Sequence, residues 1–300
     1  MVVLGALPPL GHELLGKRFV VDAGGHPAGA AGIVTDPSIP VDAEFLDEAG
    51  SFLEVVANFG VGYDNIDLDA ARARGVRVTN TPGVLTNATA ELAVALMLAA
   101  ARRIAEADAT VRSGEWARSD ANELIGRELA GATVGLVGFG RIARRVAQLL
   151  RGFDVRLLFT SRSSGTPSAG LERLDLPDLL AASDFVSVHV PLTAETRHLI
   201  GANALAAMKP GAILVNTSRG AVVDTPALIH ALRSGRLGAA GLDVYEDEPH
   251  VPSELRELRG TVLLPHIGSA TAATRNAMAR LCAENVIAVI DGRDPPTPVV

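Results

Sequence analysis

Short apolar runs alternate along the chain with longer segments in which apolar residues recur at helical spacing. This alternation is typical of βαβ units that build a parallel sheet. In the first part of the chain the apolar runs predict strands near residues 2–6, 19–21, 32–35, 53–58 and 77–79. Thr81-Pro82-Gly83 then interrupts the pattern, because proline restricts the residue before it and glycine admits unusual backbone angles.

A long helix is predicted over residues 86–113, where Leu92, Ala95, Leu96 and Ala99 fall at helical spacing. One face of this helix is too apolar for a simple surface helix. Two interpretations stay open: the face is buried within one subunit, or it forms the contact of a homodimer.

A second series of apolar runs predicts six more strands and the helices between them. The strands are expected at 133–138, 155–160, 185–189, 212–216, 239–244 and 262–264, and helices at 142–150, 177–182 and 225–234. The series is complete before the last helix, 272–290, which is therefore expected to return to the first domain. The sequence predicts an α/β protein with residues 1–82 plus 272–300 in one domain and 83–271 in a second, doubly wound domain.

The composition restricts the kinds of partner and the cellular compartment that suit the protein. Hydrophobic residues make up 48% of the 300 residues and aromatic residues only 4%, which indicates an aliphatic core. The net charge of −7 offers no basic footprint for nucleic acid, and no dense Lys/Arg run suits a membrane surface. The single cysteine, Cys282, allows no intramolecular disulfide, and no signal peptide or membrane-spanning run is found. We therefore expect a cytoplasmic protein.

A glycine-rich loop opens the second domain. The predicted strand at 133–138 runs into Gly138-Phe139-Gly140-Arg141-Ile142-Ala143, a G-x-G-x-x-A pattern that opens a helix. In such a loop the first glycine makes the tight turn and the second lets the backbone approach a pyrophosphate. The N–H groups at the start of the helix, those of Arg141 and Ile142, bind the phosphates. Because a strand precedes the loop and a helix follows it, we interpret it as a dinucleotide site rather than a structural turn.

The end of the next strand indicates which dinucleotide is bound. NAD-binding domains place a carboxylate there, about 20 residues after the loop, to bind a ribose hydroxyl. Here the strand ends in Ser161-Arg162-Ser163 instead. No carboxylate repels a 2′-phosphate, and the arginine and the hydroxyl groups can bind one. The sequence predicts NADP(H), with NAD(H) as the alternative if Arg162 is only a solvated loop residue.

Three polar residues follow later strands of the second domain, at the sheet edge where doubly wound proteins bind ligands. They are Arg219, His266 and one carboxylate of the run Glu246-Asp247-Glu248, among which composition cannot choose. Reduction of a 2-oxoacid requires side chains of these three types. Arginine can bind the carboxylate bidentately, histidine can protonate the carbonyl oxygen, and a neighbouring carboxylate orients the histidine and stabilises its charged form.

Several segments of the chain resemble those of the D-isomer-specific 2-hydroxyacid dehydrogenases, and among these the glyoxylate/hydroxypyruvate reductase branch. The resemblance covers nearly the whole chain. It includes 58–67 (NFGVGYDNID), 134–143 (VGLVGFGRIA), 189–193 (HVPLT) and the blocks around Arg219, 243–249 and 265–270. It implies a Rossmann cofactor domain (83–271) and a flavodoxin-like substrate domain (1–82 plus 272–300) with a cleft between them, assembled as a homodimer.

The resemblance also implies residue roles. His266 would be the acid/base, Arg219 would bind and polarise the substrate, and Glu248 is selected as the partner of His266 because the family's glutamate directly precedes a proline. The remaining roles are binding roles, and no metal ligand is assigned. The backbone of Val61 and Gly62 would hold the substrate carboxylate, and the cofactor would contact Gly138, Gly140, Arg141, Ile142, Ser161, Arg162, Ser163, Pro191, Thr217, Asp243, His266 and Gly268.

The expected reaction is therefore hydride transfer from NADPH to a small 2-oxoacid, giving the D-2-hydroxyacid. Two alternatives remain at this stage. One is another dehydrogenase of this architecture, acting on formate, phosphite or phosphoglycerate. The other is an NAD(P)-sensing binding protein, since such relatives can keep the three polar residues.

Overall fold

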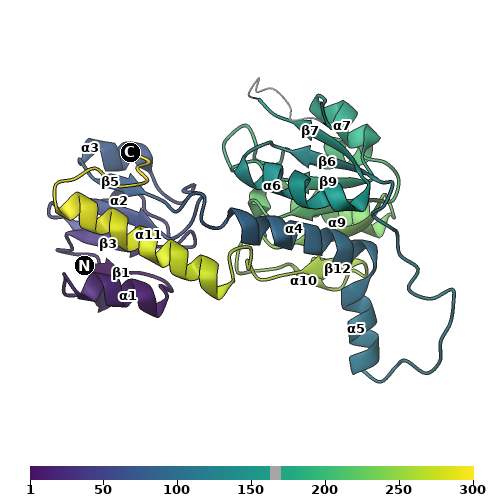
Figure 1. Cartoon of the computed structure of the whole chain (residues 1–300), viewed down its shortest axis with the longest axis horizontal. Coiled ribbons are helices and arrows are strands. Elements are labelled where there is room, and N and C mark those ends of the chain that lie inside the picture. Colours follow the sequence, from purple (N-terminus) through teal and green to yellow (C-terminus); the bar gives the residue numbers. More distant parts are fainter. Residues whose placement is uncertain (163–169) are drawn as a thin grey trace. The chain divides into compact units, whose positions relative to one another are not determined.

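The computed structural model describes residues 1–162 and 170–300. The chain divides into two compact units, each with its own parallel sheet. The first unit comprises Met1–Thr86 and Ser269–Val300, and the second comprises Asn87–Gly268. In Figure 1 the purple and yellow ribbons belong to the first unit, and the teal and green ribbons form most of the second.

The sheet of the first unit has the strand order β2-β1-β3-β4-β5 and is parallel throughout. This is the flavodoxin-like order 2-1-3-4-5. Apart from β2, its strands are mostly buried, as expected of a sheet covered on both faces. The strands are β1 (Val2–Val3), β2 (Asp22–Ala23), β3 (Gly32–Thr35), β4 (Val55–Asn58) and β5 (Arg77–Thr79).

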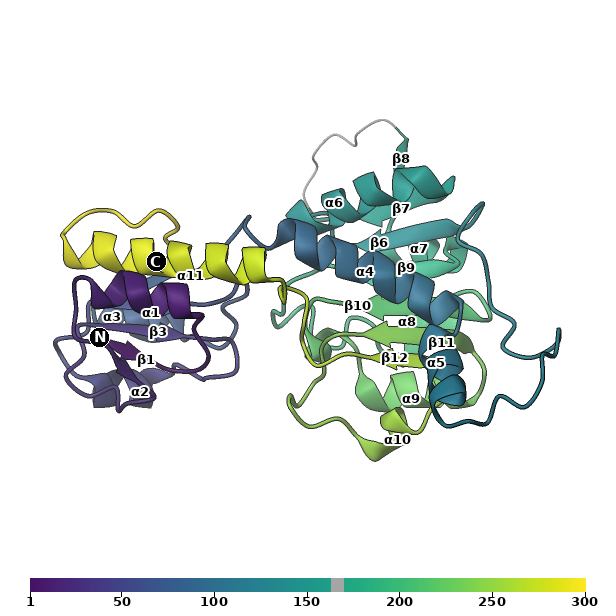
Figure 2. The same ribbon diagram turned by 60° about the horizontal axis from the view of Figure 1, so that its bottom comes forward.

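Four helices cover the two faces of this sheet: α1 (Pro9–Gly16), α2 (Ala43–Ala49), α3 (Leu68–Ala73) and α11 (Ala272–Ile290). Helix α11 lies over β3, β4 and β5 beside α1, and α2 and α3 pack together on the opposite face (Figure 2). Asp42, Asp67 and Thr271 cap α2, α3 and α11 by accepting hydrogen bonds from backbone N–H groups of the first turn.

The sheet of the second unit has the order β12-β11-β10-β9-β6-β7-β8 and is also parallel. Counted along the chain, this is the Rossmann order 3-2-1-4-5-6 with one more strand at the end. The carboxyl ends of all these strands therefore meet at one edge of the sheet. The strands are β6 (Thr133–Val137), β7 (Arg156–Thr160), β8 (Leu171–Arg173), β9 (Phe185–Val188), β10 (Ala212–Asn216), β11 (Leu237–Leu242) and β12 (Thr261–Leu263).

Two aliphatic cores lie on the two faces of this sheet. One core joins it to α4 (Thr86–Ala101) and α6 (Arg141–Leu150). The other joins it to α7 (Leu176–Ala182), α8 (Ala202–Ala207), α9 (Thr225–Arg233) and α10 (Ser253–Arg256). Two short 3-10 turns, η1 (Arg151–Phe153) and η2 (Gly220–Val222), complete the unit, together with α5 (Ile104–Arg112). The α/β class and both doubly wound sheets predicted from the sequence are confirmed.

Three elements differ from the sequence prediction. The strand predicted at 19–21 is wrong: Val20 is almost fully exposed, and the edge strand is β2. The helix predicted over 86–113 is broken at Arg103, whose φ of 53° is left-handed and ends the helical hydrogen bonding of α4 before α5 begins. Strand β8 was not predicted. In addition, no helix among the described residues is long and apolar enough to cross a membrane.

Candidate active site

His266 follows β12 at the carboxyl edge of the second sheet. Its backbone takes the left-handed conformation, with φ 52°, and its N–H donates to the carbonyl oxygen of Asp243 at 2.9 Å. Its ring atom Nδ1 lies 2.7 Å from Oε2 of Glu248, and about two-fifths of its side chain is exposed. Since Nδ1 is engaged by the carboxylate, Nε2 is the ring atom that can meet a substrate.

Both carboxylate oxygens of Glu248 are hydrogen-bonded. Oε2 faces His266, and Oε1 accepts the backbone N–H of Tyr245 at 2.8 Å. Burial alone would raise the pKa of Glu248, but the hydrogen bond and charge of His266, the Tyr245 N–H and the charge of Arg219 outweigh it. The pKa of Glu248 is therefore below its ordinary value, and the group is a carboxylate at neutral pH.

Arg219 follows β10 in a loop that the Asn216 side chain organises. Asn216 donates to the carbonyl oxygen of Arg219 at 2.9 Å and accepts from the backbone N–H and the hydroxyl of Ser218. The next residue, Gly220, lies so close to the backbone of Tyr245 that a Cβ atom would overlap it. The loop that carries Arg219 is therefore packed against the loop that carries Glu248. The structure thus brings together the three predicted polar residues, Arg219, Glu248 and His266.

Asp243 is buried at the end of β11 and supports the segment after His266. Its Oδ1 accepts the N–H of Ile267 and its Oδ2 the N–H of Gly268, both at 2.7 Å. Burial raises the pKa of Asp243, although these two N–H groups and the charge of His266 oppose the rise. The hydroxyl of Thr89, on α4, donates to the carbonyl oxygen of Gly268 at 3.1 Å. Thr89 was not singled out from the sequence.

The glycine loop joins β6 to α6 as its sequence predicts. Gly138 has φ 92°, and a Cβ there would lie 2.8 Å from the carbonyl oxygen of His189, so glycine is required by the fold itself. Gly140 differs: its φ is −80°, and a Cβ would meet nothing within 4 Å. No side chain caps α6, so its first N–H groups, those of Arg141 and Ile142, open toward the space beside Gly140. This space fits a phosphate group.

Further polar atoms at the same sheet edge support the fit of a dinucleotide. The hydroxyl oxygen of Thr217, after β10, is buried and has no hydrogen-bond partner among the described residues. The same is true of the ring nitrogen Nε2 of His189, after β9. Burial lowers the pKa of His189 to about 4, so its ring is neutral. Buried polar atoms of this kind normally find a partner, which a bound ligand can supply. His189 was quoted from the sequence only as part of a motif.

The other predicted cofactor residues lie at the ends of β7 and β9. Pro191 follows β9, and its carbonyl oxygen accepts the hydroxyl of Thr196 at 2.6 Å. Ser161 and the exposed Arg162 directly follow β7. Ser163 lies outside the described residues.

Val61 and Gly62 belong to the first unit, in the loop after β4. The side-chain amide of Asn80 donates to the carbonyl oxygen of Val61 at 2.8 Å, and that of Asn58 to the carbonyl oxygen of Gly62 at 2.6 Å. Asn58 is fully buried and Asn80 largely so. The bond to the Val61 carbonyl orients the peptide group that carries the Gly62 N–H. The peptide group that carries the Val61 N–H is held in turn by the Thr81 N–H, which donates to the carbonyl oxygen of Gly60 at 2.9 Å.

Known proteins share this sequence and fold. Residues 94–268 match the family model of the D-isomer specific 2-hydroxyacid dehydrogenase, NAD binding domain. A glyoxylate reductase of Thermococcus litoralis is 51% identical over 296 residues, which cover 96% of this chain and 86% of that protein.

Solved structures agree over the whole chain. A Thermus thermophilus protein with 45% identity has a TM-score of 0.93, with 100% of this chain and 99% of that chain covered. An NADPH-dependent glyoxylate/hydroxypyruvate reductase of Sinorhizobium meliloti, in complex with NADP and malonate, has 37% identity, a TM-score of 0.92 and coverage of 100% and 96%. The chain therefore belongs to the D-isomer specific 2-hydroxyacid dehydrogenase family, and it is an oxidoreductase that carries the family's NAD-binding domain.

Proposed function

We propose that the enzyme uses NADPH to reduce glyoxylate and hydroxypyruvate, giving glycolate and D-glycerate. The observation that carries this proposal is the 2.7 Å contact between His266 Nδ1 and Glu248, beside the charge of Arg219, at the carboxyl edge of the nucleotide-binding sheet. The glyoxylate reductase relatives, about half identical over almost the whole chain, support the choice of substrate.

The substrate carboxylate is bound first by charge. The guanidinium of Arg219 offers a planar fork that matches a carboxylate, and the backbone N–H groups of Val61 and Gly62 add two neutral donors. Because the carbonyls of Gly60 and Val61, which share peptide groups with these N–H groups, are bonded to Thr81 and Asn80, the N–H groups are oriented before the substrate arrives. Little ordering is then required on binding.

The proton comes from His266. Glu248 holds Nδ1 and stabilises the charged ring, so Nε2–H donates its proton to the carbonyl oxygen of the substrate. Bound NADPH supplies the hydride that the carbonyl carbon receives. The substrate gains one hydride and one proton, and His266 is left neutral. Arg219 stabilises the negative charge that develops on the oxygen during the transfer.

The cofactor preference rests on the end of β7. Ser161 and Arg162 stand where a carboxylate would select NAD, and an arginine there can bind a 2′-phosphate. The Sinorhizobium meliloti relative, which is NADPH-dependent and was solved with NADP, has the same fold over the whole chain. NADPH is therefore the proposed cofactor, with NADH as the weaker alternative.

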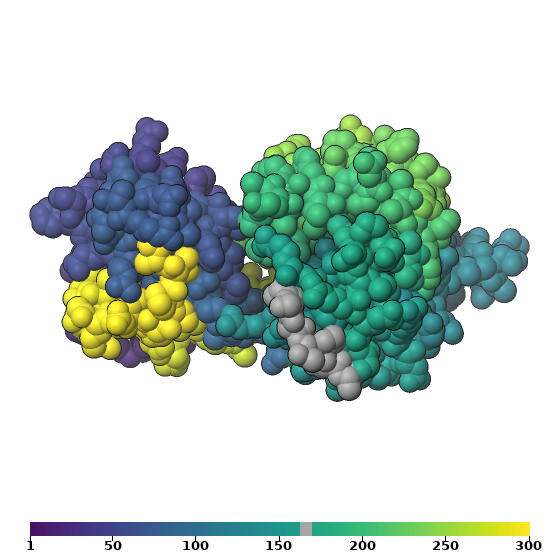
Figure 3. Space-filling model, turned by 90° about the horizontal axis from the view of Figure 1, so that it is seen from above, coloured from purple at the N-terminus to yellow at the C-terminus, as the bar shows by residue number. Residues whose placement is uncertain are grey.

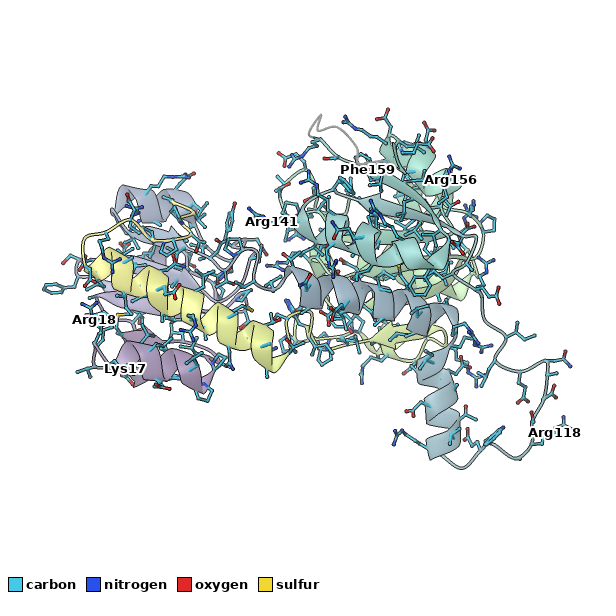
Figure 4. All side chains as sticks on the ribbon, in the orientation of Figure 1. Lys17, Arg18, Arg118, Arg141, Arg156 and Phe159 are labelled. Atoms are coloured by element: carbon cyan, nitrogen blue, oxygen red, sulfur yellow. The ribbon has the colours of Figure 1, made fainter. Side chains whose placement is uncertain are left out.

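The proposed assembly is a homodimer formed by the second unit. Helix α5 and the segment after it project from the body of this unit (Figure 1), and the extension is seen again in Figure 3. Arg118 marks the outer part of this extension in Figure 4. Four large apolar side chains on it are more than half exposed, and a second copy would cover them. They are Ile104, Val111, Trp116 and Ile125.

The experiment follows the loss of NADPH and of NADH absorbance separately, with glyoxylate, hydroxypyruvate, pyruvate and phenylpyruvate. We expect fast turnover with NADPH on glyoxylate and hydroxypyruvate, and a His266→Ala variant that binds NADPH but turns over roughly 10² to 10⁴ times more slowly. Preference for NADH would overturn the cofactor proposal alone. Tight cofactor binding without turnover of any 2-oxoacid would overturn the catalytic proposal and favour a sensor.

The same protein answers two secondary questions. Light scattering that gives twice the mass of the chain supports the homodimer, and a monomer at micromolar concentration rejects it. The cytoplasmic location stays a prediction, which fractionation of the source cells tests.

A further inference from the structure

Arg173 reaches the end of a strand other than its own. It is the last residue of β8, the edge strand that pairs with β7, and it lies opposite Phe159 in the register. Its Nη2 donates to the carbonyl oxygen of Ser161 at 2.7 Å. The side chain therefore extends along the sheet toward the carboxyl end of β7.

That position coincides with the expected ribose of the dinucleotide. In a Rossmann sheet the strand after the glycine loop ends beside the ribose that carries the adenine, and the residue there reads its 2′ substituent. Strand β7 is this strand, since it pairs with β6 and follows the Gly138–Ala143 loop along the chain. Ser161 and Arg162 directly follow it.

We propose that Arg173 is a second ligand of the 2′-phosphate of NADP, acting beside Arg162 as a residue that determines cofactor specificity. This inference rests on the proposed NADPH preference. A guanidinium has five N–H donors, and the bond to the carbonyl oxygen of Ser161 uses only one of those on Nη2. The remaining donors can bind phosphate oxygens, and the Ser161 bond holds the group in place before the cofactor binds.

The surrounding charges are compatible with an anion. Glu172 precedes Arg173, but neighbouring residues of a strand point to opposite faces, and its carboxylate is bonded by Arg156 at 2.6 Å. Figure 4 labels Arg156 and Phe159, which lie near opposite ends of β7.

Arg162 has a carboxylate near it. The hydroxyl of Thr193 and, more weakly, the charge of Arg162 hold the pKa of the exposed Glu195 below its ordinary value. Part of the positive charge of Arg162 is thereby offset. A second arginine restores the positive charge that a 2′-phosphate, with close to two negative charges, requires.

The test measures cofactor binding without substrate, by fluorescence titration of NADPH and NADH. For Arg173→Gln we expect the Kd of NADPH to rise roughly tenfold, while the Kd of NADH stays within about twofold. Competition by 2′,5′-ADP should weaken in parallel, whereas competition by 5′-AMP should not. Arg156→Gln is the matched control, because it removes an exposed arginine from the same pair of strands at the end far from Ser161. It should change neither Kd.

Each outcome decides one question. If Arg173→Gln weakens NADPH and NADH equally, or neither, the inference is overturned and Arg173 only ties β8 to β7. Should that variant fold poorly, Arg173→Lys keeps the charge and should retain more of the NADPH preference than Arg162→Gln. A wild-type protein without any NADPH preference would remove the cofactor proposal itself. A preference that survives in Arg173→Gln removes only the role of Arg173.

Discussion

The carboxylate of Asp243 accepts the backbone N–H of Gly268 at 2.7 Å, and the carbonyl oxygen of the same glycine accepts the hydroxyl of Thr89. His266 lies two residues earlier and has a left-handed backbone, which a non-glycine residue adopts only when its surroundings hold it. The bonds to Asp243 and Thr89 provide this constraint. The orientation of the His266 ring is therefore determined by buried groups as well as by Glu248.

Replacement of Thr89 by valine should weaken this constraint. The valine has the same shape but leaves the carbonyl oxygen of Gly268 without its hydroxyl donor in a buried place, so the free energy of unfolding should fall by about 1 kcal/mol or more. Urea denaturation measures the change. Thr89→Ser keeps the hydroxyl and should recover most of the loss; equal losses in both variants would contradict the role of the hydrogen bond.

Glu248→Gln should move the pH dependence of the reaction toward acid. The pKa of Glu248 is lowered, so its carboxylate stays charged to lower pH than that of an ordinary glutamate. The negative charge is lost only when the pH falls through the lowered pKa. Without the carboxylate the charged ring of His266 is less stable, so the alkaline limb of 2-oxoacid reduction should shift to lower pH.

The measurement is kcat for reduction against pH, for wild type and Glu248→Gln. Activity at alkaline pH should fall by roughly tenfold or more, while activity at the acid end changes less. Asp247→Asn removes a neighbouring carboxylate that makes no ion pair with His266 among the described residues, and its profile should match wild type. An unshifted profile in Glu248→Gln would reject the pairing of Glu248 with His266.

Gly140→Ala should separate cofactor binding from folding. A Cβ at this position meets nothing within 4 Å and the φ of −80° suits alanine, so the thermal midpoint should not fall. In the bound state the methyl group would occupy the space of the pyrophosphate, and the Kd of NADPH should rise at least tenfold. Gly152→Ala, also in open space but in η1, is the control for both measurements. Unchanged NADPH binding in Gly140→Ala would place the phosphates elsewhere.

The sequence predicts those parts of the fold and the site that depend on local pattern. Both sheets follow from apolar runs and glycine or proline breaks, and the glycine loop, Arg219 and His266 follow from their places after predicted strands. Glu248 was separated from Glu246 and Asp247 only by the family resemblance. Contacts between distant residues are not visible in this way: Thr89 and Gly268 are 179 positions apart.

Strand β8 was missed for a related reason. It is three residues long, two of them charged, and it becomes a strand only by pairing with β7. The break at Arg103 was also missed, because the sequence there keeps helix-forming residues on both sides. Tertiary contacts decide such elements more than propensity does.

Gly220→Ala should push the loop that carries Arg219 away from the loop that carries Glu248. A Cβ at Gly220 would overlap the carbonyl carbon and oxygen of Tyr245 and the nitrogen of Glu246, all of them backbone atoms that cannot rotate away. One loop must move, and displacements of about 1 Å at a catalytic group lower rates by about 10². We therefore expect kcat/KM for glyoxylate to fall by at least that factor, together with a lower thermal midpoint. Gly16→Ala, on α1 with nothing within 4 Å of its Cβ, should leave both values unchanged; wild-type activity in Gly220→Ala would show that the two loops are not coupled.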